Sequence, residues 1–144
     1  MGRYKSRAKR YDEATSAMDT ARYDAQAALQ EIVEGRNVKD APDPGEKEKV
    51  EKIVDDFLTA WSEGIGEINE LKDEMESWRD NMSSANMEHL PKYEEVDECV
   101  NELENALGEL EDPSIDVEDA TQASSEIEGL DPNGYSPNFP GMYS

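Results

Sequence analysis

The sequence predicts an all-α protein whose long helices pack as an antiparallel helical bundle or a coiled-coil hairpin, followed by an extended C-terminal tail. Apolar residues recur at alternating steps of three and four along three long stretches, which is the spacing of a helix face that packs on another helix. The chain is also 35% hydrophobic and 35% charged. This balance favours narrow apolar stripes with solvated outer faces over a broad core.

Residues 1–35 form a basic N-terminal segment and the first predicted helix. We expect this helix to begin near Tyr4 or Tyr11 and to end near Val33, with residues 36–45 as a linker. Its apolar stripe is rich in alanine, which lets a partner helix approach closely. The stripe consists of Tyr11, Ala14, Met18, Ala21, Ala25, Ala28 and Ile32.

Residues 46–111 form a predicted hairpin of two long helices. Asp43-Pro44, followed by Glu46, has the order of an N-cap, a first-turn proline and a capping-box partner. The first helix of the hairpin should therefore start near Pro44, and it extends to about Met82. Its stripe includes a glycine, which permits a bend or a tight helix crossing. The stripe consists of Val50, Val54, Phe57, Trp61, Gly64, Ile68, Leu71, Met75, Trp78 and Met82.

The other helix of the hairpin spans about Pro91 to Leu110, and Asp112-Pro113 ends it. Residues 112–130 are an acidic segment that fits either a short helix or irregular coil. Residues 131–144 hold three prolines and two glycines, so we expect an extended tail there. The stripe of the helix is Tyr93, Val96, Val100, Leu103, Leu107 and Leu110, and the tail carries Tyr135, Phe139 and Tyr143.

Charge is distributed unevenly along the chain, whose formal net charge is −22. After Lys92 there are 15 acidic residues and no basic one. Such a surface repels nucleic acid and anionic membranes and attracts basic protein surfaces. Salt adaptation is an alternative origin of the acidity. Direct nucleic-acid binding is expected only through the basic residues of the N-terminal segment, which are Arg3, Lys5, Arg7, Lys9 and Arg10.

The residue types needed for most catalytic sites are scarce. One cysteine, Cys99, and one histidine, His89, exclude a zinc set and a Cys–His dyad. The pairs Glu67-x-x-Glu70 and Glu94-x-x-Asp97 are similar to the magnesium ligands of all-α nucleotide pyrophosphatases. However, 36 of the 144 residues are acidic, so such pairs also arise by chance. We therefore expect no enzyme, cofactor or metal site, with a magnesium enzyme as a third hypothesis.

A resemblance to small acidic helical proteins of tailed bacteriophages covers roughly residues 65–110. It is carried by the sequence from Glu70 to Met82, which holds Trp78-x-x-Asn81, and then by Lys92-Tyr93 and Leu103-Glu104. In those proteins a Trp-x-x-Asn helix end precedes a short loop and a final heptad helix. The resemblance implies a phage context. With no apolar run long enough to span a membrane and no signal peptide, we expect the host cytoplasm or the virion as location.

These observations favour a non-catalytic protein that binds a basic surface of another protein through its helices and acidic surface. A sharper version is a nucleic-acid mimic that inhibits a host factor. The alternative is a structural or assembly component of a virus particle, held by its helical stripes and C-terminal arm, and a homo-oligomer is compatible with both. The candidate contact residues are Trp61, Trp78, Glu94, Glu95, Asp97, Glu98, Glu102, Tyr135, Phe139 and Tyr143. The two tryptophans fit either core packing or a binding hot spot.

Overall fold

The computed structural model describes residues 6–38 and 41–140, which form four α-helices and no strand. The all-α prediction is confirmed for this part of the chain. Residues 112–130, for which the sequence left helix and coil open, include the shortest helix. The helices are α1 (Arg7–Glu34), α2 (Glu46–Ser84), α3 (Pro91–Leu110) and α4 (Ala120–Glu128).

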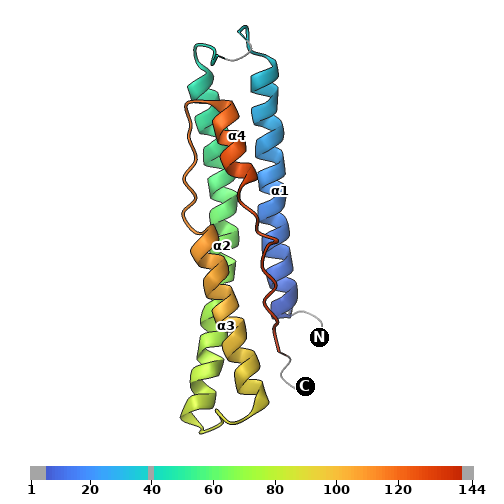
Figure 1. The fold of residues 1–144 in the computed structure, drawn as a ribbon, viewed down its shortest axis with the longest axis vertical. Coiled ribbons are helices and arrows are strands. Elements are labelled where there is room, and N and C mark those ends of the chain that lie inside the picture. The colour runs from blue at the N-terminus through green and yellow to red at the C-terminus, as the bar shows by residue number, and fades with distance from the viewer. Residues whose placement is uncertain (1–5, 39–40, 141–144) are drawn as a thin grey trace.

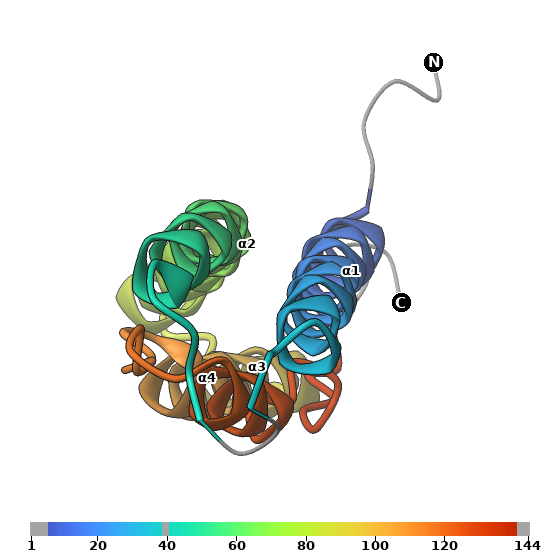
Figure 2. The same cartoon turned by 90° about the horizontal axis from the view of Figure 1, so that it is seen from above.

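The helices stand in three columns (Figure 1). α1 and α2 form an antiparallel hairpin, and the third column lies against one side of it, as the view from above shows (Figure 2). α3 occupies the half of this column near the end of α2, and α4 occupies the other half. The two short helices approach each other from opposite ends, and residues 111–119 connect them along the α2 side (Figure 1).

Helix α1 begins at a side-chain cap. Ser6 has extended backbone, and its hydroxyl oxygen accepts a hydrogen bond from the backbone N–H of Lys9 at 3.1 Å. This bond satisfies one of the N–H groups that a helix start leaves unpaired. The helix therefore begins at Arg7, between the two predicted starts at Tyr4 and Tyr11.

Helix α2 begins later than predicted. Its N-cap is Gly45, with φ +85°, a left-handed conformation that glycine adopts readily. The prediction of Asp43 as N-cap is wrong, because its carboxylate instead accepts a hydrogen bond from the backbone N–H of Asn37 at 3.2 Å. Glu46 does accept from the backbone N–H of Asp43 at 3.3 Å, as a capping-box partner would.

The core is formed by the apolar stripes of the helices. In α2 every stripe residue is buried except Trp78, and in α3 every one except Tyr93. In α1 the predicted stripe is only partly confirmed in its second half, where Ala25 is buried and Ala28 is half-buried, while Leu29, outside the stripe, is fully buried. An α-helix has about 3.6 residues per turn, so the buried face drifts away from strict heptad positions.

Gly64 allows α1 and α2 to cross closely. A Cβ atom built on Gly64 would collide with the side chain of Met18 and lie 3.3 Å from the carbonyl oxygen of Ala14. Met18 is 0% exposed, so its side chain is confined by the core. Gly66, on the same helix, has nothing within 4 Å of the corresponding point. Only the first glycine is therefore needed for packing.

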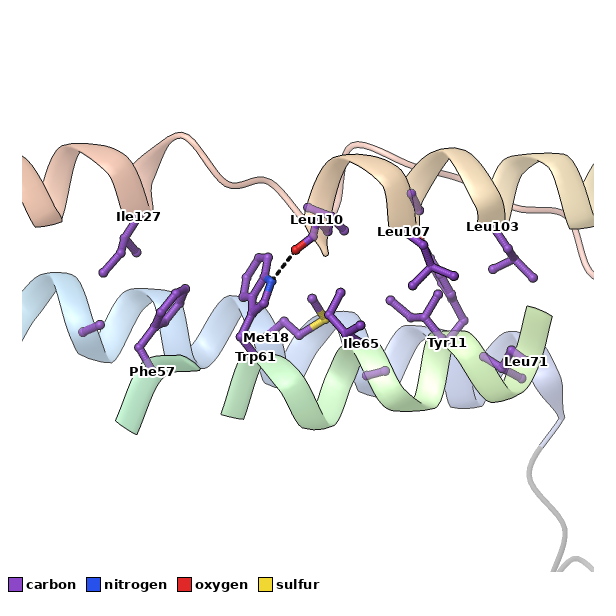
Figure 3. Packing of buried hydrophobic residues seen from close by; sticks show 14 of the residues in the cluster. Tyr11, Met18, Phe57, Trp61, Ile65, Leu71, Leu103, Leu107, Leu110 and Ile127 are labelled. Atoms are coloured by element: carbon purple, nitrogen blue, oxygen red, sulfur yellow. Dashed lines mark hydrogen bonds between the residues drawn. The ribbon is translucent and has the colours of Figure 1, made fainter. Parts of the chain in front are cut away.

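Trp61 marks the level at which α3 ends. Its indole N–H donates to the carbonyl oxygen of Leu110 at 2.8 Å (Figure 3), and its side chain is 1% exposed. The bond satisfies a carbonyl that the helix end would leave unpaired. Asp112, with φ +54°, follows the C-cap residue Glu111 and turns the chain away from the helix. The column beyond this point is left free for α4.

An ion-pair network, here called the Arg36 clamp, joins the buried side chains of Arg36 and Glu46 to the more exposed Asp119. The guanidinium donates to both oxygens of Glu46 at 2.9 and 2.6 Å and to Asp119 at 2.9 Å. The side chains of Arg36 and Glu46 are 3% and 2% exposed. Hydrogen bonding to Arg36 holds the pKa of both carboxylates below their usual range. The clamp thereby ties the N-cap residue of α4, Asp119, to the connection between α1 and α2.

Candidate interaction surface

The outer side of α3 carries an acidic face, defined here as Glu94, Glu98, Glu102, Glu104 and Glu109. Glu94, Glu98, Glu104 and Glu109 are exposed, and Glu102 is half-buried. These side chains lie away from the stripe that packs on α2. Within residues 6–38 and 41–140, none of the five forms an ion pair with a basic side chain. Their charges are therefore displayed without local compensation.

Two further predicted contact residues on α3 are partly neutralised. The ammonium group of Lys92 lies 3.7 Å from the carboxylate of Glu95. The guanidinium of Arg79 lies 3.0 Å from the carboxylate of Asp97, which fastens α3 to α2. Glu95 and Asp97 thus contribute less net charge to the surface than the residues of the acidic face.

Glu102 lies on the flank of α3 that is turned toward α1. Burial is the main cause that raises the pKa of Tyr11, on α1, to about 12, and the negative charge of Glu102 adds to it. Because Glu102 is half-buried, its carboxylate is less available to a partner than those of the exposed acids of this face.

The acidic surface continues beyond α3. Exposed acids follow in the connection to α4, in α4 itself and at the start of the tail: Glu111, Asp112, Asp116, Glu128 and Asp131. Two acids in this region are neutralised, since Glu118 lies 3.8 Å from Lys47 and Asp119 belongs to the Arg36 clamp. The third column therefore concentrates negative charge on the outside of the molecule.

The basic residues at the start of α1 are largely used internally. Arg10 contacts Glu67 at 2.6 Å and Glu74 at 2.9 Å, and Arg7 contacts Glu74 at 3.0 Å. These ion pairs hold the start of α1 against α2. Lys9 is exposed, whereas Arg3 and Lys5 lie outside the described residues. Two of the five cations expected to contact phosphate are thus already paired with carboxylates.

The two tryptophans have different environments. Trp61 lies in the core, so its ring is not on the surface. Trp78 is half-buried, with the guanidinium carbon of Arg7 5.6 Å from its ring centroid. It lines a surface hollow of about 460 Å³ together with Asp73 and Glu74. Of the two, only Trp78 can meet another molecule directly in this conformation.

The aromatic residues of the tail pack on the chain's own helices. Tyr135 and Phe139 are half-buried against the core, and the rings of Phe139 and Tyr11 are 5.8 Å apart. Tyr143, the third predicted contact residue of the tail, lies outside the described residues. In this conformation Tyr135 and Phe139 therefore offer a partner only part of their surfaces.

The acidic pairs considered as magnesium ligands do not assemble. Glu67 and Glu70 are turned toward Arg10 of α1, whereas Asp97 contacts Arg79. Among the described residues, no group of three or more His, Cys, Asp or Glu side chains is placed to hold a metal ion. Burial raises the pKa of the Cys99 thiol to about 11, so it is protonated at neutral pH and a poor nucleophile.

Sequence reasoning missed the Arg36 clamp and the hydroxyl of Tyr11. Glu46 was noticed as a capping residue, but nothing in the sequence points to Asp119, 83 positions from Arg36. The Tyr11 hydroxyl is buried and has no hydrogen-bond partner. Its position in an apolar stripe predicts burial of the ring, but gives no signal about the oxygen.

No helix in the described part of the chain has the length and apolar character needed to cross a membrane. Comparison with protein-family models, curated proteins and solved structures found no match to this chain. The functional argument therefore depends on the surface itself.

Proposed function

We propose that this is a non-catalytic protein that binds a basic surface of another protein through the acidic face of α3. The observation that carries the proposal is the separation of charge in the fold. Arginines pair with acids between α1 and α2 and in the clamp, while no basic side chain of the described residues pairs with the acidic face of α3. Uncompensated charge of one sign speeds encounter with an oppositely charged partner and selects against like-charged ones.

The density of charge on α3 supports the sharper version, a nucleic-acid mimic. Seven acids lie between Glu94 and Glu109. At about 1.5 Å of rise per residue they span about 22 Å, or one carboxylate per 3–4 Å, and the five acids of the acidic face alone give about one per 4–6 Å. One strand of duplex DNA carries a phosphate about every 3.4 Å. A site that binds a phosphate backbone would therefore meet a similar linear density of negative charge on this helix.

Because part of the sequence resembles phage proteins, we propose that this protein acts in an infected bacterium. Trp78-x-x-Asn81 lies near the end of α2, just before the loop that leads to α3. A phage protein with an uncompensated acidic helix would act in the host cytoplasm by occupying the nucleic-acid site of a host factor. This context depends on the resemblance, and the binding proposal stands without it.

A second candidate function is a structural or assembly role in the virus particle. It is favoured by the tail, whose residues 135–140 form no hydrogen bond with the rest of the described chain. Such an arm can leave its own helices and pack on a neighbouring subunit at low cost. Light scattering on the purified protein at rising concentration would show stepwise association in that case, and a concentration-independent monomer would count against it.

Matched charge-neutralised variants test the acidic face. The test variant is Glu94→Gln/Glu98→Gln/Glu109→Gln, and the control variant is Glu48→Gln/Asp55→Asn/Glu63→Gln on α2. All six residues are exposed and none forms an ion pair among the described residues, so both variants lose three charges. Each protein is immobilised and used to capture partners from a bacterial lysate, with elution by rising salt.

We expect a partner retained by the wild type and the control variant to be lost, or to elute at lower salt, with the test variant. The partner should be rich in Lys and Arg at its binding site. If both variants weaken capture equally, the protein binds through its overall charge and not through α3. If neither the charge-neutralised variants nor rising salt weakened capture of the partner, an electrostatic interface would be refuted.

A further inference from the structure

The tail fills a space between two helices that do not pack on each other. In the described chain the backbones of α1–α2, α2–α3, α1–α4 and α2–α4 approach each other closely, whereas the backbones of α1 and α3 lie farther apart. Residues 131–140 run down this side of the molecule from the end of α4 (Figure 1). The space between α1 and α3, here called the α1–α3 groove, is therefore closed by the tail and not by helix packing.

The tail is anchored at its start and loosely held beyond it. The guanidinium of Arg22 donates to the backbone oxygen of Leu130 at 2.6 Å, and Pro132 is buried. After Gly134 no hydrogen bond joins the described tail to the helices. Tyr135 and Phe139 hold this part by apolar contact alone. Segments with few buried contacts and solvent-paired backbone open at the low end of the local stability range.

Two buried reactive side chains face the region that the tail covers. Tyr11, in contact with Phe139, is 5% exposed, and Cys99 is 1% exposed. Cys99 and Tyr135 both lie close enough to Tyr11 for their charges to affect its pKa, and Glu102 lies close to both Tyr11 and Cys99. The Tyr11 hydroxyl is buried without a hydrogen-bond partner among the described residues, although buried hydroxyl groups normally have one, so covering it has an energetic cost.

We propose that residues 135–140 are a strap that detaches from the α1–α3 groove while residues 131–134 and the four helices stay in place. The occupant of the closed groove is the chain's own tail, with Tyr135 and Phe139 seated four residues apart. Opening exposes Tyr11 and Cys99 together with the apolar stripe edges beside them. A molecule that binds in the groove must first displace the strap, so the strap controls access to this surface. The inference is independent of the acidic face.

The single thiol of the chain reports on the strap in the full-length protein. Cys99 is mixed with Ellman's reagent, whose disulfide is attacked by the thiolate to give a mixed disulfide and release a coloured thiol. In the wild type the reaction should be slow and its rate nearly independent of urea below the unfolding transition, as expected for local opening. Phe139→Ala should accelerate it about tenfold, which corresponds to about 1.4 kcal/mol. Tyr135→Ala/Phe139→Ala should accelerate it further.

The control is Tyr23→Ala, which removes an aromatic ring of α1 that is 74% exposed and should leave the rate unchanged. Circular dichroism must show unchanged helix content in every variant. A synthetic peptide of residues 131–144, added to the double variant, should slow the reaction again by refilling the groove.

Three results would overturn the proposal. One is a reaction rate that Phe139→Ala and the double variant leave unchanged. Another is a wild-type Cys99 reaction rate that rises with urea as steeply as the global unfolding equilibrium does. This measurement uses only the wild type, so it remains decisive if the variants do not fold. The third is a peptide that gives no protection at any concentration, because an open groove must accept the segment that normally fills it.

Discussion

Replacing Gly64 by alanine should destabilise the protein, although the same change usually stabilises a helix. Gly64 lies where α1 and α2 cross, and an added Cβ would overlap the side chain of Met18 and crowd the carbonyl oxygen of Ala14. Met18 is fully buried, so it has no solvent-filled space into which to move. The helices must separate locally, or the methionine must adopt an unfavourable rotamer.

The magnitude follows from two opposing effects. Alanine gains about 1 kcal/mol over glycine in a helix interior, while inserting a methyl group into a packed core costs about 1–3 kcal/mol. With backbone on one side and a confined side chain on the other, we take the upper part of that range and expect Gly64→Ala to lose about 1–2 kcal/mol net. Gly66→Ala is the matched control, because nothing lies within 4 Å of its added Cβ. It should gain about 0.5–1 kcal/mol.

Urea unfolding monitored by circular dichroism measures both variants, and thermal midpoints should move in opposite directions by about 2–4 °C per kcal/mol. The double variant Met18→Ala/Gly64→Ala should lose less stability than the two single changes added together, since the new methyl group would occupy space left by the methionine. The close crossing would be refuted if Gly64→Ala matched Gly66→Ala in stability.

Further predictions concern the Arg36 clamp and Trp61. Arg36→Met should cost about 2–4 kcal/mol in urea unfolding, because it leaves Glu46 buried and charged without its partner. The clamp stabilises the fold fully above the ordinary carboxyl pKa values, and this stabilisation is lost as pH falls through the lowered pKa values of Glu46 and Asp119. The difference in unfolding free energy between wild type and Arg36→Met should therefore shrink below about pH 4. A difference that stays constant down to about pH 2 would argue against the ion pair. Trp61→Phe should cost about 1–3 kcal/mol of stability, since the carbonyl of Leu110 loses its hydrogen-bond donor. Trp78→Phe, at the surface, should cost less than about 0.5 kcal/mol. Equal losses of stability in the two variants would contradict the placement of the two rings.

Periodicity predicted the core of α2 and α3 well, because each of these helices buries one continuous stripe. It was only partly confirmed in the second half of α1, where Leu29 replaces Ala28 in the core. There the helix meets both α2 and α4, and the buried face rotates with the true helical pitch. The start of α2 was misplaced for a local reason, since Gly45 forms a left-handed turn that a sequence containing Asp43-Pro44 does not require.

The candidate surface was only partly accessible to sequence reasoning. The acidity of α3 was evident, but which acids are compensated depends on residues distant in the chain, as Arg79 and Asp97 show. Trp61 and Trp78 share one stripe and are equivalent by spacing. They differ because Trp61 stands at the level where α3 ends and can donate to Leu110. The contact between Tyr11 and Phe139 joins the two ends of the chain and has no local sequence signal.

Competition for the captured partner tests the proposed function most directly. The partner is bound to the immobilised protein at fixed ionic strength, and duplex DNA, single-stranded RNA or polyglutamate is added at equal total charge. If the acidic face of α3 occupies a nucleic-acid site, DNA or RNA should release the partner at concentrations near its own affinity for that nucleic acid, and polyglutamate should release much less. Retention of the partner at saturating DNA and RNA, or equal release by polyglutamate, would contradict the account.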